Sequence, residues 1–174
     1  MKRLKFLLLD ADVVIKIFEL GLWDQIIEHC DIHISRTIIE NEALYYKSGE
    51  IHERINLTPH KENKIITEVD IQLSELNDFR NKFGLNYLDR LHSGETESLA
   101  YLNTKDEPFL LCSADKIVFR VLPQLNRAEQ GISLEEVLQQ VGLGRSLEKH
   151  FTKAYREIWT KKGQEEMIRG IGLK

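Results

Sequence analysis

Residues 4–14 read LKFLLLDADVV, an apolar run of strand length that stops at two acids. An unbroken apolar run is typical of a strand that is buried on both faces of a parallel sheet, so we predict a strand over residues 4–9. The apolar positions that follow Asp12 fit a helix that ends at Gly21. Asp10 would then stand at the carboxyl end of a buried strand, directly before a helix.

The same alternation of strand and helix continues along the chain. We predict strands at 32–35, 64–69, 109–113 and near Ile132, and helices at 22–29, 36–47, 71–83, 94–103, 115–126 and 133–141. Ser133 and Glu136 have the spacing of a capping box, and the polar residues 48–63 predict a loop or a short helix. Strands that alternate with helices imply parallel strands joined by right-handed crossovers. The expected fold class is therefore α/β: three layers, with a mostly parallel central sheet and helices on both faces.

Charge is divided unevenly along the 174 residues, whose net charge is −4. Residues 1–144 carry sixteen Lys/Arg and twenty-four Asp/Glu, whereas residues 145–174 carry eight Lys/Arg and four Asp/Glu. We expect one α/β domain over residues 1–143 and a basic helical C-terminal extension over residues 144–174. No apolar run approaches the roughly 20 residues that span a bilayer, and the apolar run after Lys5 is too short for a signal peptide, so we expect a cytoplasmic protein without membrane contact.

The basic extension has two interpretations. Three aromatic residues in it follow one another at helical i, i+4 spacing: Phe151, Tyr155 and Trp159. We expect this stripe to pack on the domain or on a partner, which includes a second copy of the chain. The functional alternative is a nucleic-acid-binding face on which bases stack, with Lys149, Lys153 and Arg156 as its candidate phosphate contacts.

Acidic residues follow several of the predicted strands. Functional groups of an open parallel sheet collect beyond the carboxyl ends of its strands. The acids that this rule selects are Asp10, Glu40, Glu95, Glu97 and Asp115. Carboxylate oxygens are the ligands that hard cations prefer, and Mg²⁺ is typically held by few protein groups together with water. A carboxylate-bound cation can promote phosphodiester hydrolysis without a Ser, Cys or His nucleophile.

Each of these acids also has a purely structural explanation. Asp10, Asp12 and Asp115 can cap the helices that they precede, and for Asp12 we expect that role. Glu95 and Glu97 stand where the helix dipole favours acids, and Glu40 can be a solvated helix residue beside Glu42. Residues two apart on a regular helix point about 200° apart, so Glu95 and Glu97 cannot both face inward unless the first turn is irregular. We keep both as candidates.

Four motifs together resemble the PIN-domain family. LLLDADVV at 7–14 resembles the opening strand of these proteins, and TIIENEA at 37–43 resembles their second motif, with its acid at Glu40. GETESLA at 94–100 resembles the Gly-Glu-x-Glu helix start of one prokaryotic, VapC-like branch. LLCSAD at 110–115 resembles the strand with Ser or Thr two residues before the last acid. The order of the motifs matches, and the likeness covers about residues 4–140.

The resemblance implies a metal-dependent ribonuclease. It implies Mg²⁺ or Mn²⁺ as the cofactor, held by Asp10, Glu97 and Asp115, with Asp12 and Ser113 in support. It also implies RNA as the substrate and, for many small members, an antitoxin protein that holds the enzyme inactive. Ala11 and Asp12 depart from the usual Ser or Thr followed by Asn, which removes a hydroxyl and adds a carboxylate. The rival hypotheses are a PIN-like RNA-binding or scaffold protein that does not cleave, and a DNA or flap-type nuclease.

Overall fold

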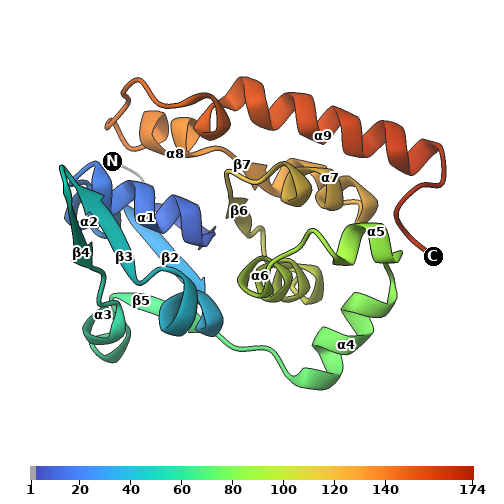
Figure 1. The fold of residues 1–174 in the computed structure, drawn as a ribbon, viewed down its shortest axis with the longest axis horizontal. Helices are drawn as coiled ribbons and strands as arrows, with labels where there is room; N and C mark the ends of the chain where they lie inside the picture. The colour runs from blue at the N-terminus through green and yellow to red at the C-terminus, as the bar shows by residue number, and fades with distance from the viewer. Residues whose placement is uncertain (1–2) are drawn as a thin grey trace.

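The computed structural model describes residues 3–174 and contains a five-stranded parallel sheet (Figure 1). Each strand pairs with its neighbours in parallel register. In sheet order the strands are β5 (Ile66–Val69), β2 (Cys30–Ser35), β1 (Leu4–Leu9), β6 (Leu110–Cys112) and β7 (Gly131–Ile132). The predicted strand at the start of the chain is thus the central one, and its apolar second half, Leu7–Leu9, is buried.

Successive leucines of β1 bury themselves in opposite layers. Leu7 and Leu9 belong to one hydrophobic cluster and Leu8 to another, because side chains alternate across a strand. The first cluster is closed by α1 (Ala11–Glu19), α2 (Trp23–His29) and α8 (Leu134–Gln140). The second is closed by α4 (Leu73–Asn81), α6 (Ser93–Thr104) and α7 (Lys116–Gln124), with the short α5 (Leu85–Leu88) beside them. The expected three-layer α/β fold is confirmed.

The segment after β2 differs from the predicted helix over residues 36–47. The structure has a short π-helix, η1 (Ile38–Glu42), in which the Ala43 amide donates to the Ile38 carbonyl at 2.9 Å. A hairpin of β3 (Tyr45–Ser48) and β4 (Ile51–Arg54) follows, and then α3 (Thr58–Glu62). The helical periodicity of this segment was misleading because Gly49, with φ of 61°, turns the chain into a hairpin instead.

The C-terminal extension packs on the domain. It contains the 3₁₀ turn η3 (Lys149–Phe151) and the long helix α9 (Lys153–Ile168), which lies along α7 (Figure 1). Gly163 permits this close approach, since a Cβ atom there would collide with the backbone of Arg120. Arg120 also donates to the buried Glu166, with NH2 and Oε1 2.7 Å apart, and Tyr87 donates to the same carboxylate.

The three aromatic residues of the extension pack on the domain, as expected, but they do not form one helical stripe, because Phe151 lies in η3 before α9 begins. Phe151 is buried in the first hydrophobic cluster, and Tyr155 and Trp159 are half-buried against the second. Between Arg3 and Lys174 no helix has both the length and the apolar character needed to cross a bilayer.

Candidate functional site

The sheet has a topological switch point between β1 and β6. From β1 the chain first builds the β2–β5 side of the sheet and later returns to add β6 and β7 on the other side. The loops after β1 and β6 therefore leave the sheet in opposite directions, which opens a crevice at the carboxyl ends of these two strands. Asp10 follows β1 here, and its amide donates to the Cys112 carbonyl of β6 at 3.0 Å.

Asp10 is buried in this crevice and fixed by two hydrogen bonds. Its Oδ1 accepts from the Ala11 amide at 2.7 Å, and its Oδ2 accepts from Ser113 Oγ at 2.7 Å. The residue is only 3% exposed. Asp10, and not Asp12 as we had expected, is the N-cap of α1, while Asp12 stands in the first turn of that helix.

Ser113 connects Asp10 to Asp115. The Asp115 amide donates to Ser113 Oγ at 3.0 Å, so a single hydroxyl contacts both acidic residues. Asp115 in turn caps α7, because its Oδ1 accepts from the Ile117 amide at 2.9 Å. Asp10 and Asp115 are therefore both helix caps. This structural role is compatible with a functional one, because the capping hydrogen bonds hold the two carboxylates in place.

Glu95 brings a further carboxylate to the crevice from α6. Its Oε2 accepts from the His92 amide at 3.0 Å, and the residue is 5% exposed. Burial, followed by the charges of Asp10, Asp115 and Asp12, raises the pKa of Glu95 to about 9. Burial is also the main reason that the pKa of Asp10 rises to about 7, with contributions from Asp12 and Asp115. We call these four residues, Asp10, Asp12, Glu95 and Asp115, the acidic cluster.

The acidic cluster has no internal counter-charge. Over residues 3–174, none of its four carboxylates forms an ion pair with a Lys, Arg or His side chain. Buried carboxylates are normally paired with a cation or bound to a metal, since burying an unpaired charge is costly. Without a bound cation this cost is offset by protonation, which is what the raised pKa values of Asp10 and Glu95 express.

The acid that η1 places nearest to the cluster is Glu42. Its Oε1 accepts from the Gly94 amide at the start of α6, at 3.0 Å, and it lines a surface pocket together with Asp12 and His92. Glu40, the residue that the sequence selected, is exposed, and its charge contributes to the raised pKa values of Arg36 and Lys61. Glu42 can lie here because residue 94 is a glycine. A Cβ atom at position 94 would collide with the Glu42 carboxylate.

Glu97 makes a different kind of contact. Its Oε1 accepts from Thr37 Oγ1 at 2.6 Å, and its Oε2 accepts from the Thr37 amide at 3.3 Å. Glu97 and Glu95 therefore do face different ways, as a helical spacing of two residues requires. Glu95 lies in the acidic cluster, and Glu97 holds the start of η1.

The donor set of the cluster suits a hard divalent cation, although it is not a closed cage. In the part of the chain from residue 3 onward, no three His, Cys, Asp or Glu side chains are placed together as a group that could hold a metal ion. Mg²⁺ is commonly bound through one or two carboxylates and several waters, so an open arrangement of carboxylate oxygens fits it better than it fits zinc. A cation bound here would therefore contact one or two of the carboxylates of Asp10, Glu95 and Asp115 and would complete its coordination with water.

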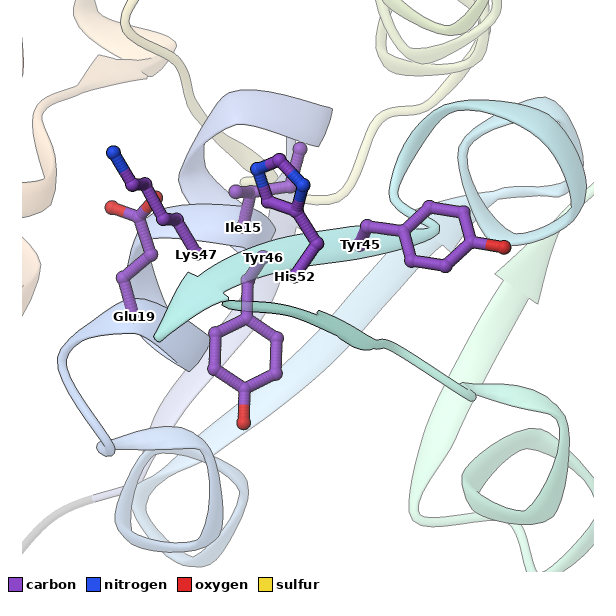
Figure 2. Close-up of a pocket in the computed structure, with 6 residues that line it drawn as sticks. All are labelled: Ile15, Glu19, Tyr45, Tyr46, Lys47 and His52. Atoms are coloured by element: carbon purple, nitrogen blue, oxygen red, sulfur yellow. The ribbon is translucent and has the colours of Figure 1, made fainter. Parts of the chain in front are cut away.

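A second pocket is lined by residues of α1 and of the β3–β4 hairpin (Figure 2). Its volume is about 450 Å³, and it shares Ile15 with the pocket that reaches Asp12 and Glu42. Tyr45 on the hairpin is 56% exposed. Figure 2 shows the Lys47 and His52 side chains on the same side of the hairpin as Ile15 and Glu19, with the Tyr45 and Tyr46 rings extending away from them. The two pockets therefore adjoin along the exposed face of α1.

The three basic residues that the sequence selected in the extension differ in their surroundings. Arg156 is engaged in a two-pronged ion pair with Glu136, with Nε–Oε2 and NH2–Oε1 distances of 2.7 and 2.8 Å. Lys149 and Lys153 are exposed, and Lys153 Nζ lies 3.6 Å from Glu157. Only the two lysines are thus presented to solvent.

Comparison of the chain with protein-family models, with curated proteins and with solved structures finds no match.

Proposed function

We propose that the protein is a metal-dependent endoribonuclease of the PIN type that binds Mg²⁺ or Mn²⁺ at the acidic cluster. The observation that carries this proposal is a pair of buried carboxylates without a basic partner, Asp10 and Glu95, at the switch point between β1 and β6. The half-buried Asp115 and the exposed Asp12 lie beside them. A divalent cation would supply the missing positive charge. The order of the four sequence motifs supports RNA as the substrate.

The chain's own residues have distinct tasks in this proposal. Asp10 and Asp115 present oxygens whose directions are set by Ser113 and by the starts of α1 and α7. Glu95 presents its carboxylate from the first turn of α6, fixed by the His92 amide. A bound cation supplies Lewis acidity toward the phosphate and lowers the pKa of water that it binds. Rigid carboxylates suit this role because they need no rearrangement when the substrate arrives.

The substrate has room to follow the face of α1. A single strand whose phosphate lies at the acidic cluster would pass Asp12 and reach the hairpin pocket, where exposed Tyr45 offers a ring for base stacking. Lys149 and Lys153 are the phosphate contacts that we retain in the extension. Arg156 is assigned to the ion pair with Glu136 instead.

The proposal is tested with a labelled single-stranded RNA and a labelled single-stranded DNA of the same sequence, each with Mg²⁺, with Mn²⁺ and with EDTA. We expect RNA cleavage that requires the metal and that falls at least about a hundredfold in Asp10→Asn and Asp115→Asn. The matched control is Asp106→Asn, an exposed aspartate outside the site. Equal cleavage of DNA would favour the DNA-nuclease hypothesis. RNA binding without cleavage at millimolar metal would favour the scaffold hypothesis.

A toxin role is a separate part of the proposal. If the protein is the toxin of a toxin–antitoxin pair, its expression in bacteria should arrest growth, and Asp10→Asn should relieve the arrest. Growth that is unaffected by the active protein would reject the toxin role and would leave the ribonuclease proposal intact.

A further inference from the structure

We propose that Glu97 is a positioning residue that holds η1 in its π-helical register and thereby keeps Glu42 against the first turn of α6. As a statement about catalysis this rests on the proposed ribonuclease function, but the structural part is independent of it. The sequence motif had suggested that Glu97 binds the metal. The contacts of Glu97 point instead to Thr37.

Two carboxylate contacts join η1 to α6 in opposite directions. Glu97 of α6 accepts from both the side-chain hydroxyl and the backbone amide of Thr37, the residue before η1. Glu42, the last residue of η1, accepts from the Gly94 amide of α6. The two elements are therefore clamped at both ends of η1, and each supplies one acid.

The clamp has a physical task because π-helical turns are rare and need local support. The π turn closes through the bond from the Ala43 amide to the Ile38 carbonyl. It accommodates one residue more than an α turn would. If this segment relaxed to α-helical bonding, Glu42 would rotate away from Gly94 and Asn41 would turn toward its place. Fixing Thr37 prevents that rotation.

The packing at Gly94 makes the arrangement specific. Gly94 is buried against Ile38 and the Glu42 carboxylate, so closely that a Cβ atom would collide with both. The Gly94 amide is in the first turn of α6, where amides have no partner within the helix. Its acceptor is Glu42. Exchange of the Gly94 amide hydrogen therefore reports directly on whether Glu42 is in place.

Amide hydrogen exchange measured by NMR on the metal-free protein tests the clamp without any assumption about activity. We expect Glu97→Ala to speed exchange at Gly94 and Ala43 about tenfold, equivalent to about 1.4 kcal/mol. Thr37→Val should act in the same direction, and Thr37→Ser, which keeps the hydroxyl, should restore protection. The Glu136 amide is an internal control, because Ser133 Oγ holds it at 3.2 Å in the first turn of α8. Its exchange rate should be the same in all of these variants as in the parent.

Metal binding and kinetics separate positioning from ligation. Glu97→Gln keeps an oxygen that can accept from Thr37, so we expect Mn²⁺ affinity within about twofold of the parent. Asp10→Asn should lower the Mn²⁺ affinity at least about tenfold. In the cleavage assay Thr37→Val should lower kcat with little change in KM, because the substrate still reaches the site.

Two outcomes would overturn the proposal. One is unchanged exchange at Gly94 in both Glu97→Ala and Thr37→Val. The other is a loss of Mn²⁺ affinity in Glu97→Gln as large as that in Asp10→Asn, with no effect of Thr37→Val, which would make Glu97 a ligand. If the parent protein neither binds Mn²⁺ nor cleaves RNA, the ribonuclease proposal fails, and the exchange data still decide the clamp.

Discussion

Replacing Glu95 with Gln should stabilise the metal-free protein, by an amount that depends on pH. Glu95 is buried, and its pKa rises from 4.5 to about 9 on folding. The folded chain therefore binds a proton that the unfolded chain has released at neutral pH. Stability linked to this group is fully present below pH about 4.5 and is lost as pH rises toward about 9. Gln carries no charge to bury, and its oxygen can still accept from the His92 amide.

The magnitude follows from the pKa. At pH 7 the cost of protonating Glu95 is about 1.4 kcal/mol for each unit above 4.5, or on the order of 3 kcal/mol. At pH 5 the same cost is below about 1 kcal/mol. For a chain of this length each kcal/mol moves Tm by about 2–4 °C, so Glu95→Gln should raise Tm by about 6–12 °C at pH 7 and very little at pH 5.

The assay is thermal unfolding followed by circular dichroism, in EDTA, at pH 5, 7 and 8. Glu50→Gln is the matched control, since Glu50 is exposed in the turn between β3 and β4. Its Tm should follow that of the parent at every pH. A Glu95→Gln variant that is less stable than the parent, or that gains the same stability at pH 5 and pH 8, would refute the claim that Glu95 is a buried, unpaired carboxylate.

Three further outcomes are expected. Mn²⁺ at a hundred times its Kd should stabilise the parent by about 2.7 kcal/mol in urea unfolding, and Asp10→Asn should remove this effect. Gly163→Ala should lower the free energy of unfolding by about 2–3 kcal/mol, because the new methyl group meets the α7 backbone. Gly144→Ala is the control and should be nearly neutral, because its Cβ would have only ordinary contacts. Equal effects of the two substitutions in urea unfolding would contradict the close α7–α9 packing. Partial burial would raise the pKa of Glu136, but the Arg156 ion pair and the Ser133 hydrogen bonds lower it, so this pair stabilises the fold above pH about 4.5. Arg156→Gln should therefore destabilise the fold at pH 7 and should do so progressively less as the pH falls below about 4.5, measured by urea unfolding.

The sequence was sufficient where the signal is local. The unbroken apolar run before Asp10 identified the central strand, and the spacing of Ser133 and Glu136 identified the capped start of α8, whose hydrogen bonds the structure contains. Both signals come from residues that are neighbours in the chain. Strand, helix and cap preferences depend on such neighbours, so the α/β alternation and the positions of Asp10 and Asp115 at strand ends were predictable.

Only the tertiary structure decided which acids meet. The periodicity after Ser35 favoured an α-helix and pointed to Glu40, but the contacts of Thr37 with Glu97 and of Glu42 with Gly94 accompany a π turn that places Glu42 at the pocket. These partners are more than fifty residues apart in the chain. These two contacts contribute stability only once α6 has packed beside β2, so no local sequence preference predicts them. Burial of Asp10 and Glu95 has the same origin, since desolvation depends on every element that packs around them.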